Sequence, residues 1–163
     1  MSTVKFKGND VHTSGKLPEV GTQAPDFKLV NGGLKEIHLS DFRGKRVLLN
    51  IFPSLDTSTC AMSVRKFNKW VSEKVNVVVI CVSKDLPFAQ SRFCSAEGLE
   101  NVITASDFRY NTFATDYGVL LTDGPLQGLI SRSVIAIDEN GKVLYTELVS
   151  EITNEPNYDL TVF

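Results

Sequence analysis

Long apolar runs occupy the middle of the chain, and alternating apolar and polar positions occupy its two ends. Residues 47–52 (VLLNIF) and 77–82 (VVVICV) are nearly continuous apolar runs, a pattern typical of strands that are buried on both faces. A third short strand is predicted at residues 101–106 (NVITAS). Because segments of helical length separate these runs, the order predicts parallel strands joined by crossover helices.

Two helices are predicted between the apolar runs. The first has an apolar face whose positions step by four, three and four residues: Cys60, Val64, Phe67 and Val71. The second begins at Pro87, which suits the first turn of a helix, and closes near Gly98. A helical turn or two is expected within residues 108–118, and a last helix is expected to begin near Pro156.

Hairpin patterns flank this unit on both sides. They comprise residues 4–6 with 11–13, residues 25–30 with 35–42, and residues 131–138 with 142–148. Since a hairpin adds antiparallel strands to a sheet, the economical arrangement is a mixed central sheet with helices on its faces. The sequence thus predicts an α/β chain with a thioredoxin-like fold, extended by an N-terminal β-hairpin.

The composition is that of one globular domain spanning residues 1–163, with 42% hydrophobic and 22% charged residues. The net charge of −2 gives no electrostatic reason to expect nucleic acid or an anionic membrane as a partner. No apolar run reaches the length of a membrane span, and the first residues lack the apolar stretch of a signal peptide. These features predict a soluble protein that is not exported.

Three cysteines carry the candidate chemistry. An odd number of cysteines in a chain of this size does not suggest a secreted disulfide scaffold. Their spacing contains no C-x-x-C pair, and the only histidines, His12 and His38, lie far upstream, so no metal site is predicted. Cys81 lies inside the apolar run 77–82 and is expected to be an inert core thiol.

Cys60 follows a predicted buried strand and lies at or near the start of the first predicted helix. The partial positive charge of a helix N-terminus favours a thiolate at such a position. The alternative is a small buried side chain in a capping sequence, since each of the four preceding residues is able to cap a helix: Asp56, Thr57, Ser58 and Thr59.

If Cys60 is a nucleophile, its thiolate needs more stabilisation than a helix N-terminus supplies. A free thiol with an ordinary pKa of about 8.5 is only about 3% ionised at neutral pH. A helix terminus contributes only about 0.3–1 kcal/mol, so a reactive thiolate needs a nearby cation as well. The candidates are Arg65, Arg92, Arg109 and Arg132. Arg132 opens a predicted strand whose end can lie beside the start of the helix.

Cys94 lies late in the second predicted helix, 34 positions after Cys60. A disulfide between them requires the two Cα atoms to lie within about 7 Å of each other, which is rare for such positions in two successive helices. Forming the bond would unwind a turn of each helix, which favours a transient bond over a structural one. The spacing alone also allows two unconnected thiols.

The sequence around these residues resembles a known family. Residues 53–60 (PSLDTSTC) resemble the Pro-x-x-x-Thr-x-x-Cys signature of the peroxiredoxins. Residues 45–68, 79–104 and 123–129 are similar to the bacterial thiol peroxidases, the atypical two-cysteine type. The resemblance therefore covers nearly the whole chain.

The resemblance implies a role for each of five residues. Cys60 is expected to be the peroxidatic cysteine, which attacks the O–O bond of a peroxide and becomes a sulfenic acid. Thr57 would hydrogen-bond the thiolate and the peroxide, Pro53 would shield the site from water, and Arg132 would supply the cation. Cys94 would be the resolving cysteine that closes an intramolecular disulfide with Cys60.

The same resemblance implies the reaction partners. The substrates would be hydrogen peroxide and organic or lipid hydroperoxides, and thioredoxin would reduce the disulfide. No cofactor or metal would take part. A homodimer in the bacterial cytoplasm is the form that this family implies.

Two features depart from the family pattern, and two other functions stay open. Thr59 stands where many members carry valine, and the last predicted helix is shorter than expected. Cys60 and Ser63 form a C-x-x-S sequence at a helix start, as in monothiol oxidoreductases of the thioredoxin fold. A disulfide between Cys60 and Cys94 would also suit a non-enzymatic redox sensor or binding protein that uses it as a switch.

Overall fold

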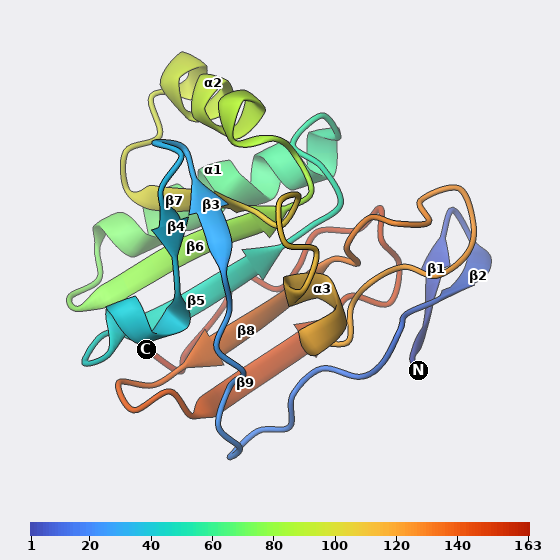
Figure 1. Ribbon diagram of the computed structural model, residues 1–163, viewed down its shortest axis with the longest axis horizontal. Helices are drawn as coiled ribbons and strands as arrows, with labels where there is room; N and C mark the ends of the chain where they lie inside the picture. The colour runs from blue at the N-terminus through green and yellow to red at the C-terminus, as the bar shows by residue number, and fades with distance from the viewer.

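The computed structural model describes all of residues 1–163 and contains a seven-stranded sheet of order β4-β3-β7-β6-β5-β8-β9 (Figure 1). Its strands are β3 (Leu29–Asn31), β4 (Glu36–Ile37), β5 (Arg46–Ile51), β6 (Val77–Ser83), β7 (Val102–Ser106), β8 (Ser133–Ile137) and β9 (Val143–Leu148). A separate hairpin comprises β1 (Thr3–Phe6) and β2 (Asn9–His12). The helices are α1 (Ser58–Ser72), α2 (Pro87–Glu97), α3 (Phe113–Asp116) and the 3-10 helix η1 (Leu39–Phe42). None of them has both the length and the apolar character needed to cross a bilayer.

The centre of the sheet is parallel and its edges are antiparallel. β5, β6 and β7 pair in parallel, whereas β8 joins β5, and β9 joins β8, in antiparallel register. The crossovers through α1 and α2 run in the same direction along the sheet, so right-handed connections place both helices on one face. The predicted thioredoxin-like mixed sheet with flanking helices is therefore confirmed.

Two apolar cores explain the continuous apolar runs of the parallel strands. Leu49 and Ile51 of β5 belong to a cluster of 18 buried residues that includes Phe113 and Tyr117. Leu48 faces the other way, into a cluster of 13 buried residues under α1. Figure 1 shows α3 in front of the sheet and α1 behind it. Since successive side chains of a strand point to opposite faces, a strand covered on both sides is apolar at nearly every position.

The N-terminal hairpin packs against the loops that follow α3 and β9. Val4 and Val11, which are partners across the hairpin, form a third buried cluster with Leu121 and Ile152. Each of these four side chains is at most 3% exposed. This packing confirms the predicted hairpin and fixes the segment after β9, whose Ile152 carbonyl also contacts Arg132.

The strands predicted at residues 25–30 and 35–42 are shorter in the structure. β3 and β4 pair over only two residues each, and η1 replaces the continuation of β4. The carboxylate of Asp41 accepts the backbone amide of His38 at 2.8 Å and thereby caps this turn. The capping hydrogen bond stabilises a 3-10 turn at Leu39–Phe42, where the alternating pattern of apolar residues predicted a strand.

The last helix expected near Pro156 was a wrong prediction, since the chain after β9 forms turns and an irregular segment. The apolar side chains Tyr158, Leu160 and Val162 recur at every second position, a period that suits an extended chain and not a helix. Leu160 belongs to the buried cluster under α1, and the other two pack against that cluster. A proline that fits a first helical turn is therefore a weaker signal here than the hydrophobic period.

Candidate active site

Cys60 lies in the first turn of α1, shortly after the end of β5, and its side chain is fully buried. The helix begins there because Thr57 is extended and its hydroxyl accepts the Cys60 amide at 3.4 Å. The apolar face predicted for α1 is indeed buried: Cys60, Val64, Phe67 and Val71. The fold thus holds the thiol at a helix N-terminus, where the helix dipole favours an anion.

Arg132 is the cation that contacts this thiol. Its Nη2 lies 3.1 Å from Cys60 Sγ, and its Nε donates to the Ile152 carbonyl at 2.9 Å. The contact follows from the sheet register, since Ile51 at the end of β5 pairs with Ser133 at the start of β8. This antiparallel pairing brings the residue before β8 beside the segment that leads from β5 into α1.

The other candidate arginines lie elsewhere. Arg65 points from α1 to α2, where its guanidinium donates two hydrogen bonds to the Glu97 carboxylate at 2.7 and 3.1 Å. Arg92 and Arg109 are exposed at the surface. The structure therefore selects Arg132 from the four candidates.

The site holds one buried positive charge and no carboxylate that neutralises it. Arg132 is only 1% exposed and takes part in none of the ion pairs of the structure. Its Nη1 is buried without a hydrogen-bond partner. A buried charge is costly unless an opposite charge or hydrogen-bond acceptors compensate it. The arrangement therefore favours an anion beside Arg132, and the sulfur of Cys60 is the group in contact.

Thr57 and Pro53 shape the turn that precedes Cys60. The Thr57 hydroxyl donates to the Ser54 carbonyl at 3.1 Å while it accepts the Cys60 amide, so in this conformation it does not donate to the sulfur. Pro53 is buried just after the end of β5. Both residues lie in the segment that delivers Cys60 to the helix start.

Asp85 is a site residue that sequence reasoning missed. Its carboxylate accepts hydrogen bonds from the Ser54 hydroxyl at 2.7 Å, the Leu55 amide at 2.8 Å and the Ser83 hydroxyl at 2.7 Å. It thereby ties the loop between β5 and α1 to the loop between β6 and α2. The available signal was an acidic residue at the carboxyl end of a buried strand, where open α/β sheets build their sites.

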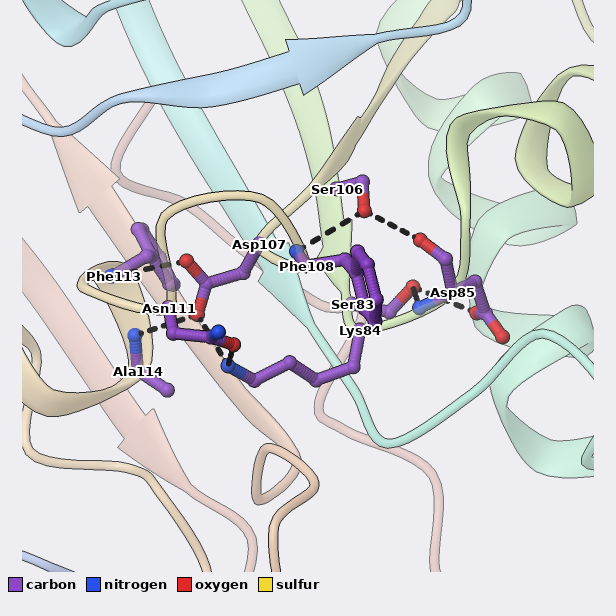
Figure 2. A network of polar contacts seen from close by, with 9 residues as sticks. All are labelled: Ser83, Lys84, Asp85, Ser106, Asp107, Phe108, Asn111, Phe113 and Ala114. Atoms are coloured by element: carbon purple, nitrogen blue, oxygen red, sulfur yellow. Dashed lines mark hydrogen bonds and ion pairs between the residues drawn. The ribbon is translucent and has the colours of Figure 1, made fainter.

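Figure 2 shows a polar network at the carboxyl ends of β6 and β7 that anchors Asp85. The Ser106 hydroxyl donates to the Asp85 carbonyl at 2.6 Å. The fully buried Asp107 accepts two backbone amides at the start of α3 at 3.1 Å and pairs with Lys84 at 3.0 Å. Because each charged side chain in this network has partners, we interpret it as a support for the two loops and not as a second reactive site.

Cys94 lies in the later part of α2 with a half-buried side chain and a free thiol. Burial raises the pKa of the Cys94 thiol, and hydrogen bonding to Thr104 of β7 offsets part of that rise. The residue lines a pocket of about 360 Å³ together with Gly32 and Gly33. Cys60 contacts Arg132, whereas Cys94 lies against β7, and both thiols are free.

Two further side chains near the thiol are structural. Cys81 is fully buried, as predicted, and burial raises the pKa of its thiol to about 12. Ser63 is also buried, and its hydroxyl donates to the Cys60 carbonyl at 2.7 Å and accepts from Asn50 at 3.2 Å. Ser63 thus fixes the first turns of α1, and the buried Cys60 is not placed for direct exchange with a protein disulfide.

A thioredoxin-like sheet with a buried thiol at a helix start, beside a buried arginine, defines the class of thioredoxin-fold proteins that act through a cysteine. No group of three or more His, Cys, Asp or Glu side chains is arranged to hold a metal ion. The Redoxin family model matches residues 19–161. The chain therefore belongs to the Redoxin family.

Similar proteins specify the branch of that family. A thiol peroxidase of Corynebacterium glutamicum is 55% identical over 98% of this chain and 96% of its own. One of Mycobacterium bovis is 54% identical, covering 98% and 95% of the two chains. The crystal structure of a peroxiredoxin-like protein from Aquifex aeolicus matches with a TM-score of 0.92 at 43% identity, covering 98% of this chain and 92% of that one. These similarities place the chain among the bacterial thiol peroxidases.

Proposed function

We propose that Cys60 is the nucleophile with which this thiol peroxidase reduces hydroperoxides. The observation that supports it best is the 3.1 Å contact between Cys60 Sγ and Arg132 Nη2, whose guanidinium pairs with no carboxylate. A helix N-terminus alone stabilises a thiolate too weakly for this chemistry. The guanidinium supplies the missing positive charge.

In the first step the Cys60 thiolate attacks one oxygen of the hydroperoxide. An S–O bond forms while the O–O bond breaks, and the leaving oxygen takes a proton. Cys60 becomes a sulfenic acid, and the substrate leaves as an alcohol, or as water when it is hydrogen peroxide. The sulfur loses two electrons and the peroxide gains them.

Arg132 would stabilise the negative charge that develops on the peroxide oxygens. Its Nη1 is buried and has no partner among the protein atoms, so it retains donors for a ligand. An oriented donor of this kind contributes about 10²–10³-fold to a rate. Pro53 would keep water out of the site, and Thr57 would turn its hydroxyl from Ser54 to the thiolate or the peroxide.

Cys94 is the proposed resolving cysteine. Its thiolate would attack the Cys60 sulfur, so that the S–S bond forms while the S–O bond breaks, and the leaving hydroxide takes a proton and departs as water. Its position in α2 supports this role, because the Arg65–Glu97 ion pair holds α2 beside α1. A dithiol reductant of the thioredoxin type would then reduce the disulfide and restore both thiols.

The proposed substrates are hydrogen peroxide and organic or lipid hydroperoxides, and the proposed reductant is thioredoxin. A cytoplasmic homodimer is the proposed form of the protein. Its proposed contact residues are the exposed apolar side chains Leu86, Phe88 and Phe108, which are 46%, 67% and 59% exposed. Exposed aromatic side chains are typical of the surfaces through which proteins associate.

A coupled assay tests this function. Thioredoxin, its reductase and NADPH are supplied with hydrogen peroxide or cumene hydroperoxide, and the consumption of NADPH is followed. The wild-type chain is expected to turn over, and Cys60→Ser is expected to be inactive. Cys81→Ala, the control in the core, is expected to keep most of the activity. Turnover by Cys60→Ser would contradict the proposal, and a wild type that is oxidised once without turnover would favour a redox sensor.

A further inference from the structure

The segment after β9, residues 150–163, runs along α1, and we call it the C-terminal strap. Glu155 of the strap pairs with Lys66 of α1 at 3.3 Å. The rings of Tyr158 and Phe67 pack edge to face with their centroids 5.1 Å apart. The strap therefore covers one side of the helix that carries the nucleophile.

Two consecutive carbonyls of the strap bind Arg132 and the residue that precedes Cys60. The Ile152 carbonyl accepts Nε of Arg132 at 2.9 Å. The Thr153 carbonyl accepts the hydroxyl of Thr59 at 3.0 Å. Since Thr59 immediately precedes Cys60, adjacent peptide groups of the strap bind the arginine and the first turn of α1.

The start of the strap is itself held by the N-terminal hairpin. The Glu151 carboxylate accepts three backbone amides at 2.9–3.2 Å, two of them from the turn of the hairpin. The Lys5 amide donates to the Ser150 carbonyl at 2.7 Å, and the Lys5 carbonyl accepts from Ile152 at 2.8 Å. The Thr153 carbonyl is therefore a fixed point against which the first turn of α1 is held.

Disulfide formation would pull the first turn of α1 away from that fixed point. Cys60 is fully buried with its sulfur on Arg132. Cys94 lies in α2 beside Thr104 of β7. Because the Cys60 sulfur is fully buried against Arg132, a bond to Cys94 would require the turn around Cys60 to open. The Thr59 hydrogen bond opposes this opening, and a valine of nearly the same shape has no donor with which to do so.

We propose that Thr59 is a positioning residue whose hydrogen bond to Thr153 keeps the first turn of α1 closed and so sets the fate of the Cys60 sulfenic acid. The inference rests on the proposed function of Cys60 and Cys94. In the closed turn a second hydroperoxide oxidises the sulfenic acid to sulfinic acid and leaves as an alcohol or water. In the open turn Cys94 attacks, the S–O bond breaks and water leaves. A firmly closed turn therefore favours oxidation to the sulfinic acid over formation of the disulfide.

The variants Thr59→Val and Thr59→Ser form a matched pair for the test, because valine removes the donor and serine keeps it. Reduced protein is mixed with graded concentrations of hydrogen peroxide without a reductant. Mass spectrometry then measures the sulfinic acid at Cys60 relative to the Cys60–Cys94 disulfide. Since one net hydrogen bond shifts an equilibrium about two- to tenfold, Thr59→Val is expected to need that much more peroxide for the same sulfinic fraction. Thr59→Ser is expected to restore the wild-type fraction.

Amide hydrogen exchange gives a second readout that does not depend on the chemistry. The amides of Cys60 and Ala61, which are bonded to Thr57, report on the first turn of α1. They are expected to exchange about two- to tenfold faster in reduced Thr59→Val than in the wild type. Thr22→Val, which removes another hydroxyl-to-carbonyl bond, of 2.6 Å, is the control and is expected to change neither readout.

An unchanged sulfinic fraction in Thr59→Val, or unchanged exchange at Cys60 and Ala61, would overturn the role of Thr59. A wild type that forms no disulfide between Cys60 and Cys94 would overturn the proposed function itself. The two failures are therefore distinguishable in the same experiment.

Discussion

Nη2 of Arg132 lies 3.1 Å from Sγ of Cys60, although the two residues are 72 positions apart in the sequence. Both side chains are buried, and no carboxylate pairs with the guanidinium. The thiolate and the transition state of its attack on a peroxide both carry negative charge, which this guanidinium stabilises. Changes to Arg132 should therefore act on the first chemical step.

Replacement of Arg132 by lysine should slow the oxidation of Cys60 by about 10²-fold or more. Lysine keeps the charge but loses the planar fork that reaches Sγ and the Ile152 carbonyl together. Stopped-flow measurement of the second-order rate constant with hydrogen peroxide tests this prediction. Arg65→Lys, which changes the exposed pair with Glu97, is the matched control and should react at nearly the wild-type rate. A wild-type rate in Arg132→Lys would exclude the proposed role.

Replacement of Cys94 by serine should separate the two halves of the cycle. Cys60 should still react with the first equivalent of peroxide, since its contacts with Arg132 and Thr57 do not involve α2. Turnover with thioredoxin should stop because no disulfide forms, and excess peroxide should convert Cys60 to sulfinic acid. Mass spectrometry of Cys60 and the coupled assay together measure both outcomes. Steady-state turnover in this variant would show that another group resolves the sulfenic acid.

The raised pKa of Cys94 predicts the pH dependence of its alkylation. Burial disfavours the thiolate, so Cys94 should ionise above the ordinary thiol value of about 8.5. In Cys60→Ser, iodoacetamide labelling of Cys94 should accelerate through a midpoint that lies above that of a cysteine in an unfolded peptide. A midpoint at or below the peptide value would be inconsistent with the burial of this thiol.

The buried thiol of Cys81 predicts a loss of stability at alkaline pH. An unfolded thiol ionises near about pH 8.5, whereas burial raises the folded pKa of Cys81 to about 12. Unfolding therefore releases a proton between these values, and the free energy of unfolding should fall by up to about 1.4 kcal/mol per pH unit in that window. Below the unfolded pKa the contribution is fully present. Urea unfolding of the wild type and Cys81→Ala at several pH values measures it, and parallel pH dependences of the two proteins would contradict the prediction.

Replacement of Asp85 by alanine should loosen the loop that leads into α1. The change leaves the buried Leu55 amide without its acceptor, which should cost about 1–3 kcal/mol in the free energy of unfolding. The rate of peroxide reduction should fall as well, because the same loop carries Pro53 and Thr57. Asp85→Asn, which keeps one carbonyl oxygen for Leu55, should lose less of both. Urea unfolding and stopped-flow oxidation measure the two effects, and unchanged values in Asp85→Ala would exclude a positioning role.

Local patterns predicted those parts of the fold in which the spacing of apolar residues along the chain reflects which side chains are buried. The continuous apolar runs predicted β5 and β6 because both strands are covered on two faces. The step of four, three and four residues predicted the buried face of α1. Arg132 was within reach of the same reasoning, because it opens the predicted strand whose start, at Ser133, pairs with the end of β5 just before α1.

The parts that local patterns did not predict depend on contacts between distant segments. Asp85 meets Leu55 across 30 positions, and Thr59 meets Thr153 across 94. Neither partner carries a local signal for the other. The helix expected near Pro156 is replaced by an extended strap because its apolar side chains pack on α1, and this packing outweighs the preference of a proline for a first helical turn.

The decisive measurement is disulfide mapping after one equivalent of hydrogen peroxide is added to the reduced wild-type chain. The remaining thiols are blocked under denaturing conditions, and the peptides are identified by mass spectrometry. The proposed mechanism predicts one intramolecular disulfide between Cys60 and Cys94, with Cys81 recovered as a blocked thiol. A product in which Cys60 is still a thiol, or in which Cys81 is joined to either of the other cysteines, would contradict it.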